Sequence, residues 1–359
     1  MKKLLTLCYL FATFQLYGQK KSFDEVLSFF HSEKNFTGAV LVATNGHIDY
    51  VNAVGLANSE SGQKMNVTSA FKIASITKTF TTVLTLQLVQ EGKIDLNATI
   101  GTYFPTYQGE GKDKVSIKNL LTYSSGISNY AEPLGMKSYQ TFLTLDEYIT
   151  QYCSGKLIES PGLKSSYSNT EFIILSKIIE NVTKKPFKKV LQERILTPLK
   201  MKNTGVFENS NEVKGLVKSY TVDDSTHHKK VDESYFVQNF YGAGAMYSTV
   251  LDLLKFDVAI FNHQLLKPET TALMLKPNSA LNNVTFGFWY SAGWGIFNNQ
   301  FVYRPGGILG STSNWIHTLD DKKSIIVFSN TNGSNLYELS EQLYLVSKEE
   351  KASIVRKDK

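Results

Sequence analysis

Segments rich in apolar and β-branched residues lie near both ends of the chain and are predicted to form strands. The predicted strands are residues 37–44, 47–54, 295–304, 312–319 and 324–330. Asn45-Gly46, between the first two strands, is the strongest short signal for a β-hairpin. Because the strands come from both ends of the chain, the sequence favours one sheet assembled from distant segments.

A helical spacing of apolar residues dominates the middle of the chain. The predicted helices are residues 23–31, 75–91, 116–121, 145–152, 170–183, 187–196, 250–261 and 335–347. Gly92 suits the C′ position after the second helix. Thr249 suits the N-cap of the seventh, with Asp252 at N3 as a short version of a capping-box acid. Strands at both ends around a helical middle therefore indicate a discontinuous architecture.

We predict an α+β fold from this order of elements. It would be an α/β sandwich, with an antiparallel sheet flanked by helices, that carries an inserted all-helical domain. The α/β part would span about residues 19–92 and 285–359, and the helical insertion about residues 93–284. Active sites commonly lie between such parts, so the boundary between them is where we expect the chemistry.

The first 18 residues have the pattern of an export signal. Lys2 and Lys3 precede an uncharged apolar run over residues 4–17, and Gly18 is a small residue at a plausible cleavage point. The run is shorter than the roughly 20 residues that a membrane-spanning helix needs, which favours cleavage over anchoring. We therefore expect a signal peptide at 1–18 and an exported mature chain, periplasmic or secreted, over residues 19–359.

Composition narrows the function classes only modestly. A hydrophobic content of 42% with 19% charged residues is typical of a globular protein. Removing Lys2 and Lys3 lowers the formal net charge from +6 to +4, and no basic footprint for nucleic acid is present. The six histidines form no His-Glu-x-x-His pair, so no metal site is expected. Neither a Gly-x-Ser-x-Gly elbow, a complete dinucleotide loop nor a Walker motif occurs, and we predict no cofactor.

The strongest chemical candidate is the tetrad from Ser75 to Lys78 (SITK). Residues three apart on a helix share one face, so the lysine amine can reach the serine hydroxyl. The apolar stretch 79–89 would bury Lys78, and burying an unpaired lysine without a purpose is costly. In the alternative interpretation Ser75 is a helix cap and Lys78 reaches the solvent. A second Ser-x-x-Lys, from Ser61 to Lys64, starts no helix and is attributed to chance.

Several further motifs follow this tetrad in a fixed order. They are Phe71–Lys78 (FKIASITK), Leu120–Ile127 (LLTYSSGI), Tyr167-Ser168-Asn169, Gly242-Ala243-Gly244 followed by Ser248, Thr249 and Asp252, and Arg304-Pro305-Gly306-Gly307. In this order they resemble the serine β-lactamase and penicillin-binding-protein-like hydrolases. The class C β-lactamase branch, with its esterase and D-peptidase relatives, is the most similar. The resemblance covers nearly the whole mature chain and implies a β-lactamase/transpeptidase-like fold.

The resemblance also implies a role for each motif residue. Ser75 would attack an acyl carbon and form an acyl-enzyme, with Lys78 and Tyr167 transferring the proton. Asn169 would orient Lys78 or hold a substrate amide. The backbone N–H groups of Ser75 and Gly307 would form the oxyanion hole.

The Arg304–Gly307 segment departs from the family pattern. Gly306 and Gly307 would let the strand edge approach the acyl group, and Arg304 would still attract anionic substrates by its charge. Pro305, however, lacks the hydroxyl of the usual threonine, so a substrate carboxylate loses a contact. Tyr123 also replaces the histidine of the family's LLTHTSGL stretch, in a segment that would support the site rather than react.

The Arg304-Pro305 departure makes efficient β-lactam hydrolysis less expected than peptidase, esterase or amidase activity. The predicted substrate is a small molecule or peptide, namely an ester, a D-amino-acid peptide or a β-lactam. A non-hydrolytic penicillin-binding or peptidoglycan-sensing protein is the alternative, and the Arg304-Pro305 sequence is the feature that favours it. The oligomeric state is left open.

Overall fold

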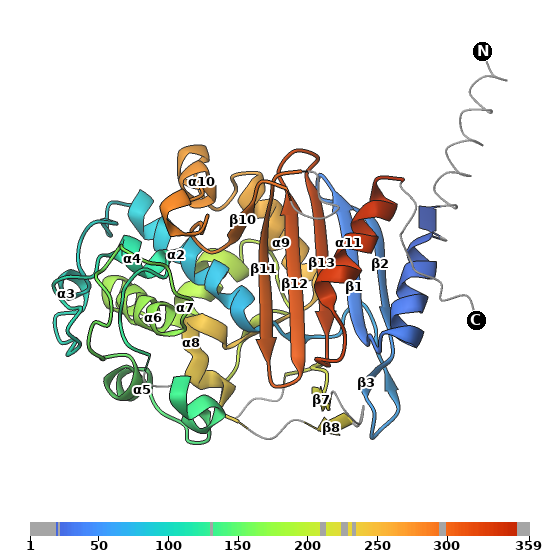
Figure 1. Cartoon of the computed structure of the whole chain (residues 1–359), viewed down its shortest axis with the longest axis horizontal. Coiled ribbons are helices and arrows are strands. Elements are labelled where there is room, and N and C mark those ends of the chain that lie inside the picture. Colours follow the sequence, from blue (N-terminus) through green and yellow to red (C-terminus); the bar gives the residue numbers. More distant parts are fainter. Residues whose placement is uncertain are drawn as a thin grey trace, which may run out of the picture.

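A computed structural model describes residues 19–20, 22–129, 132–208, 213–223, 229–231, 235–293 and 299–349. The predicted signal peptide at residues 1–18 lies outside the described residues. In the described part, a sheet stands beside a predominantly helical region, and the two meet along α2 and β11 (Figure 1). No helix in this part of the chain is both long and apolar enough to cross a membrane.

The central sheet has six antiparallel strands in the order β10-β11-β12-β13-β1-β2. Their bounds are β1 (Gly38–Thr44), β2 (His47–Val54), β10 (Trp289–Ser291), β11 (Phe301–Ile308), β12 (Ser311–Thr318) and β13 (Lys323–Ser329). The first strand pairs with the last, with Val40 opposite Val327. Asn45 and Gly46 have φ of 51° and 78°, as a tight hairpin turn requires. The predicted sheet of distant segments is confirmed.

Ten α-helices, α2 to α11, are labelled in Figure 1 in the described part of the chain. They are α2 (Thr77–Gln90), α3 (Ile100–Tyr103), α4 (Ile117–Leu121), α5 (Leu145–Tyr152), α6 (Thr170–Thr183), α7 (Phe187–Leu191), α8 (Tyr241–Gly244), α9 (Val250–Phe261), α10 (Pro268–Leu275) and α11 (Leu336–Ser347). Residues 22–33 are also helical. As predicted, the Thr249 side chain caps α9 by accepting from the Asp252 backbone N–H.

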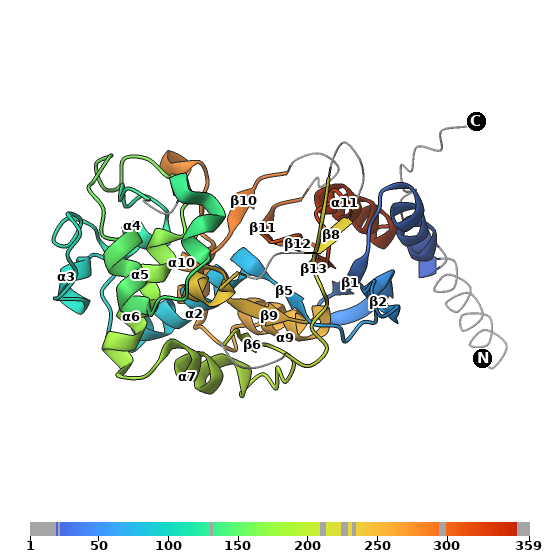
Figure 2. The same cartoon turned by 90° about the horizontal axis from the view of Figure 1, so that it is seen from below.

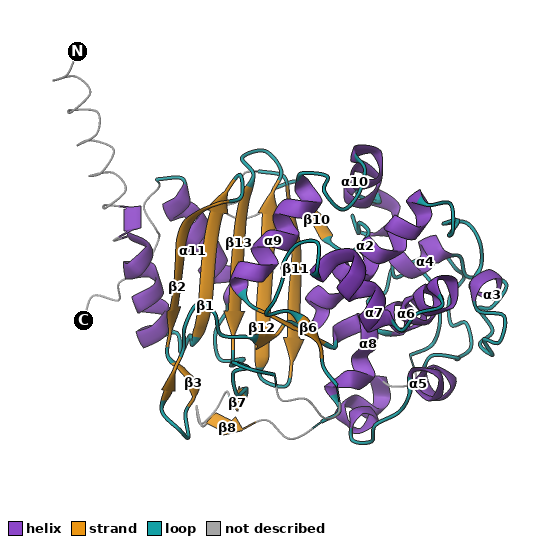
Figure 3. Cartoon of the chain, turned by 180° about the vertical axis from the view of Figure 1, so that it is seen from behind, coloured by secondary structure: helices purple, strands orange, loops and turns teal. Residues whose placement is uncertain are grey.

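The two faces of the sheet are covered by different helices, as Figures 1 and 3 show. On one face Val40 and Val42 pack with α11 and with apolar residues of helix 22–33. Alternate residues of the same strand, Ala39 and Leu41, point to the opposite face and join the larger core that contains α9 and the helical region. The antiparallel sheet flanked by helices confirms the predicted α+β class.

Short strands lie next to α9, between the helical region and the six-stranded sheet (Figure 2). β5 (Phe71–Lys72), β9 (Met246–Ser248) and β6 (Gly205–Val206) form a three-stranded sheet. Two smaller strand pairs are β3 (Leu56–Asn58) with β4 (Gln63–Lys64) and β7 (Tyr220–Val222) with β8 (Lys229–Val231). The 3-10 turns η1 (Ala74–Ile76) and η4 (Val237–Phe240) both contact α8. The chain enters α2 directly from β5 through η1, which sets the position of the predicted nucleophile.

Several predicted element boundaries differ from the structure. The second helix begins at Thr77 rather than Ser75, because residues 74–76 form the tighter 3-10 turn η1 before the α-helix starts. The predicted strand 295–304 lies partly outside the described residues, and β11 continues through to Ile308. α9 falls within the predicted limits of the helical insertion but packs against β13 and β1 of the sheet.

Candidate active site

The sequence-predicted site residues meet where η1, α2, the start of α6 and β11 converge. Ser75 lies in η1 and Lys78 in the first turn of α2. Tyr167 precedes α6, and Asn169 occupies the N-cap position of that helix. The Arg304–Gly307 segment lies on β11 against η1. The structure therefore brings all seven predicted positions close together.

The Ser75 hydroxyl contacts both proposed proton carriers. Its Oγ lies 2.5 Å from the Tyr167 Oη and 3.1 Å from the Lys78 Nζ. The preceding residue, Ala74, has φ of 46°, a left-handed conformation that turns the chain sharply between β5 and α2. Non-glycine residues in this conformation are uncommon and are concentrated at functional sites. The hydroxyl is thus presented at a bend in the backbone.

Lys78 is completely buried, with 0% of its surface exposed. Its three N–H donors match three acceptors: the Ser75 Oγ, the Asn169 Oδ1 at 2.7 Å and the Ala243 carbonyl at 2.8 Å. Burial lowers the pKa of Lys78 to about 8, with Tyr167 opposing and the Arg304 charge assisting that shift. The predicted burial of Lys78 is confirmed, and its amine can exchange a proton near neutral pH.

Tyr167 forms the other half of the proton-carrying pair. Burial alone would raise the pKa of Tyr167, but the Lys78 and Arg304 charges and the hydrogen bonds with Lys78 and Ser75 lower it to about 8. The Lys78 Nζ also lies 4.9 Å from the centre of the Tyr167 ring. Because these two groups interact strongly, they titrate as a pair rather than as separate residues.

The two glycines of β11 have different surroundings. A Cβ atom on Gly306 would lie 2.5 Å from the Ile73 carbonyl oxygen and 3.1 Å from the Ser75 backbone nitrogen. Any side chain there would push the nucleophile away from the strand. A Cβ atom on Gly307 would meet nothing within 4 Å, because this residue borders the open pocket.

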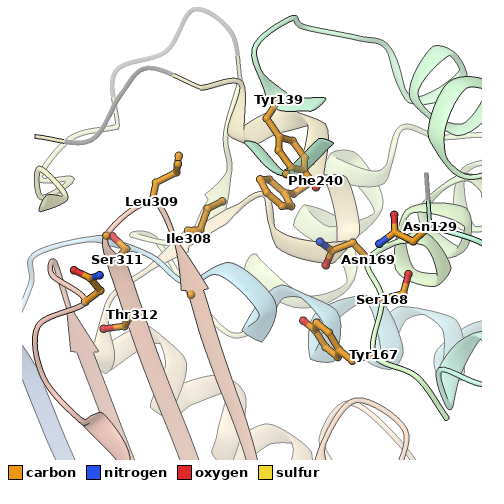
Figure 4. Close-up of a pocket in the computed structure, with 14 residues that line it drawn as sticks. Asn129, Tyr139, Tyr167, Ser168, Asn169, Phe240, Ile308, Leu309, Ser311 and Thr312 are labelled. Carbon is orange, nitrogen blue, oxygen red and sulfur yellow. The ribbon is translucent and has the colours of Figure 1, made fainter. Parts of the chain in front are cut away.

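A pocket of about 510 Å³ extends from Tyr167 toward the turn between β11 and β12 (Figure 4). Amides and hydroxyls supply its polar lining: Asn129, Asn169, Ser311, Thr312 and Asn332. The stacked rings of Tyr139 and Phe240, with centroids 3.8 Å apart, form an apolar wall. None of the described residues that line this pocket carries a charged side chain. Its lining suits an uncharged group with hydrogen-bonding atoms.

Arg304 does not line this pocket. Its side chain is 0% exposed and points into the protein, where Nε donates to the Ser75 carbonyl at 3.0 Å and Nη2 donates to the Tyr123 Oη. The expected attraction of anionic substrates by this charge is therefore not supported by the geometry. The guanidinium is held beneath the aromatic rings of Tyr123 and Tyr167 instead of being presented to a ligand.

Three residues of the site were not singled out from the sequence as chemical participants. The Ala243 carbonyl accepts from Lys78, and the only sequence signal was the Gly-Ala-Gly segment around it. Tyr123 was expected to support the site, but its contact with Arg304 had no sequence signal. Glu171 is completely buried, accepts from the Ser125 Oγ at 2.7 Å and shares an electrostatic interaction with Lys78. Its position two residues after Asn169 was the available clue.

The fold and the site together define a class of protein: an antiparallel sheet with a helical region, and a serine held between a buried lysine and a tyrosine. A family model described as Beta-lactamase matches residues 23–347, so the chain belongs to the β-lactamase family. The predicted resemblance is confirmed, and so is the functional class of a β-lactamase-related hydrolase.

The similarity to individual relatives is low in sequence identity but extends over most of this chain. The Bacillus subtilis (strain 168) protein PbpX, provisionally described as a penicillin-binding protein, is 25% identical over 91% of this chain and 79% of its own length. The teichoic acid D-alanine hydrolase of Staphylococcus aureus is 27% identical over 67% of this chain, which spans 58% of that relative. Among solved structures, D-amino acid amidase from Ochrobactrum anthropi SV3, complexed with D-phenylalanine, has a TM-score of 0.81 and 22% identity, with 92% of this chain and 99% of that chain covered.

Proposed function

We propose that this protein hydrolyses an ester or amide through an acyl-enzyme formed on Ser75. The observation that carries the proposal is the position of the Ser75 Oγ, which lies within hydrogen-bond distance of both the Tyr167 Oη and the Lys78 Nζ. A serine is a weak nucleophile until a neighbouring base accepts its proton. Two adjacent groups with pKa values near 8 meet that need at neutral pH.

In the proposed reaction, the Ser75 oxygen bonds to the acyl carbon while its proton passes to the Lys78–Tyr167 pair. The carbonyl oxygen becomes an oxyanion, for which the backbone N–H groups of Ser75 and Gly307 are the proposed donors. The carbon–heteroatom bond then breaks, and the leaving group takes the proton from the pair. Water then attacks the resulting ester and gives a proton to the pair, and the bond between the acyl carbon and the Ser75 oxygen breaks as Ser75 takes that proton back. Asn169, which accepts from Lys78, fixes the amine during both steps.

The proposed substrate carries no carboxylate on its acyl group. Amides, hydroxyls and aromatic rings line the pocket, and the nearest guanidinium faces away from it. A carboxylate on the acyl group would therefore be desolvated without a compensating partner. The relatives that hydrolyse D-alanine groups and D-amino acid amides support a small acyl group linked through an ester or amide. Neutral esters should exceed their carboxylate-bearing analogues in kcat/KM by roughly tenfold, a difference of about 1.4 kcal/mol.

Covalent labelling tests this proposal. A fluorophosphonate should add one mass to the full-length protein as Ser75 displaces fluoride, and Ser75→Ala should abolish the addition. Ser61→Ala is the matched control, because Ser61 belongs to the second Ser-x-x-Lys but is exposed beside β4. Labelling that survives Ser75→Ala would overturn the nucleophile assignment. Stoichiometric labelling without turnover of any ester or amide would instead support the non-hydrolytic binding protein.

We also propose that the chain is exported and that residues 1–18 are removed. The support is the pattern of Lys2 and Lys3 before an uncharged apolar run, and the similarity to a hydrolase named for teichoic acid. The amino-terminal sequence of the protein recovered from an expressing culture tests this. A mature chain that begins at Gln19 is expected, whereas intact Met1 on the exported or retained protein would contradict cleavage.

A further inference from the structure

Two residues at which this chain departs from its family's motifs contact each other. Tyr123 stands where the LLTHTSGL-like stretch has histidine, and Arg304 stands where a lysine or histidine is usual. They are 181 positions apart, yet the Arg304 Nη2 donates to the Tyr123 Oη. The centre of the guanidinium lies 5.6 Å from the Tyr123 ring. Neither side chain is more than 1% exposed.

Tyr123 is fixed firmly enough to hold its partner. Its backbone has φ of 53°, an uncommon conformation for a tyrosine. Its ring packs against the rings of Tyr167, Phe172 and Trp289, with centroid distances of 5.1, 5.2 and 5.7 Å. Because burial raises the pKa of Tyr123, its hydroxyl stays neutral and can accept a hydrogen bond from the guanidinium.

Arg304 uses separate nitrogens of one planar group for two tasks. Nε donates to the Ser75 carbonyl at 3.0 Å, while Nη2 reaches Tyr123. A lysine has one nitrogen on a flexible stem and cannot span the same two acceptors in a fixed plane. The third nitrogen, Nη1, is buried and has no hydrogen-bond partner in the described part of the chain. An unpaired buried donor is costly, so a structural role alone explains this arginine poorly.

Building on the proposed acyl-enzyme function, we infer that Tyr123 and Arg304 are a pair of positioning residues. Tyr123 orients the guanidinium, and the guanidinium fixes the Ser75 backbone and keeps a positive charge 5.6 Å from the Tyr167 ring. Neither residue touches the substrate. Both act through Ser75 and Tyr167, and each needs the other in place.

The charges around Tyr167 determine the sign of the expected pH effect. Lys78 from α2, Ser75 from η1 and Arg304 from β11 face its phenol, and Glu171 from α6 acts on Lys78. The Arg304 charge favours loss of a proton from either member of the Lys78–Tyr167 pair. Removing that charge should raise both pKa values, so the acid limb of kcat/KM should move to higher pH.

A double-mutant cycle with pH profiles tests the pair, with p-nitrophenyl acetate as substrate. Arg304→Gln should lower kcat/KM by about a hundredfold and move the acid limb up by about one pH unit. Arg304→Lys keeps the charge, so it should lower kcat/KM by about tenfold while moving the limb by less than about 0.3 unit. If Arg304→Gln fails to fold, Arg304→Met supplies the neutral variant.

The cycle is completed with Tyr123→Phe, which should lower kcat/KM by about tenfold alone and by less than about threefold in the neutral Arg304 variant. Tyr107→Phe is the matched control, because Tyr107 is equally buried but donates to the Cys153 carbonyl. It should leave kcat/KM within about twofold. Equal effects of Tyr123→Phe in both backgrounds, or an unmoved limb in the neutral variant, would overturn the inference. Fluorophosphonate labelling of Ser75 in the wild-type protein separates failure of this inference from failure of the proposed function. If Ser75 is not labelled, the proposed function is wrong. If Ser75 is labelled but the mutant results contradict the expectation, only the positioning role of Tyr123 and Arg304 is wrong.

Discussion

Two polar clusters share one face of the six-stranded sheet, and they are built differently. Arg304 of β11 lies directly opposite Trp315 of β12, so their side chains point to the same face. Arg304 belongs to the catalytic cluster, which we define as Lys78, Tyr123, Tyr167, Asn169, Glu171 and Arg304. Trp315 belongs to the Asp257 cluster, which we define as Asp257, Trp315, His317 and Ser324.

The Asp257 cluster pairs its charged group completely. The Asp257 carboxylate accepts from the Trp315 Nε1 at 2.7 Å, the His317 Nδ1 at 3.0 Å and the Ser324 Oγ at 2.6 Å. The His317 ring also stacks on Phe261, with centroids 3.4 Å apart. Since Asp257 lies on α9 and its three donors lie on β12 and β13, these bonds fix the helix to the sheet.

The catalytic cluster leaves polar atoms unpaired. The Arg304 Nη1 and the Glu171 Oε2 are buried without a hydrogen-bond partner in the described residues, and the pKa values of Lys78 and Tyr167 are shifted. Stability alone would favour satisfying these atoms, as the Asp257 cluster does. The contrast teaches that one cluster maintains the fold and the other accepts a thermodynamic penalty for reactivity.

Replacing Lys78 by Met should produce the largest separation of activity from stability. Met fills a similar volume but cannot accept or donate the proton, so kcat/KM for an ester should fall by about 10³–10⁴-fold. The melting temperature should stay within about 3 °C of wild type, because removing a desolvated charge offsets the loss of its three hydrogen bonds. Steady-state hydrolysis and thermal unfolding of the same preparation measure both quantities. A loss of melting temperature with activity retained would reverse the assignment of the two clusters.

Asp257→Asn should have the opposite effect. An amide N–H2 would replace one of the two acceptor oxygens, for example the Oδ2 that now accepts from His317 and Ser324, so the free energy of unfolding should drop by about 3 kcal/mol. The kcat/KM per folded molecule should remain within about threefold of wild type. Urea unfolding, with activity measured well below the transition, checks this expectation. A tenfold loss of kcat/KM in fully folded protein would show that the Asp257 cluster also serves the reaction.

Glu171→Gln should have the smallest effect and a defined pH dependence. Burial raises the pKa of Glu171 above its usual 4.5, so the ionised side chain destabilises the folded state as pH rises past that value. The Gln variant lacks this penalty and keeps an acceptor for Ser125. Its melting temperature should equal that of wild type near pH 4 and exceed it by about 2 °C at neutral pH. An advantage that is largest in acid and absent at neutral pH would contradict the assigned direction.

Much of the fold could be predicted because local patterns and global structure agree. The hairpin at Asn45-Gly46, the cap at Thr249 and the burial of Lys78 each follow from a short segment of sequence. The order of motifs was sufficient to group Ser75, Lys78 and Tyr167. The distances from the Ser75 Oγ to Lys78 and Tyr167 depend on the packing of α2 against α6. Each motif can nevertheless be recognised by itself in the sequence.

What escaped prediction depends on side-chain direction. Charge is visible in a sequence, but whether a strand residue turns toward the pocket or into the core is decided by its partners. Arg304 was expected to face a substrate, and instead its guanidinium turns inward to the Ser75 carbonyl and Tyr123. The start of α2 was misplaced for a different reason: a 3-10 turn over Ala74–Ile76 precedes it, and nothing in the sequence separates that turn from the α-helix.

The central claim is that the Lys78–Tyr167 pair activates Ser75, and the pH dependence of covalent labelling tests it most directly. The second-order rate constant for fluorophosphonate addition to Ser75 should rise with pH and level off above an apparent pKa near 8. Loss of the Lys78 charge should raise the pKa of Tyr167, so in Lys78→Met the rise should move to higher pH and the rate at pH 8 should fall at least tenfold. A rate that is flat from pH 6 to 9, or an adduct mapped to any residue other than Ser75, would contradict the account.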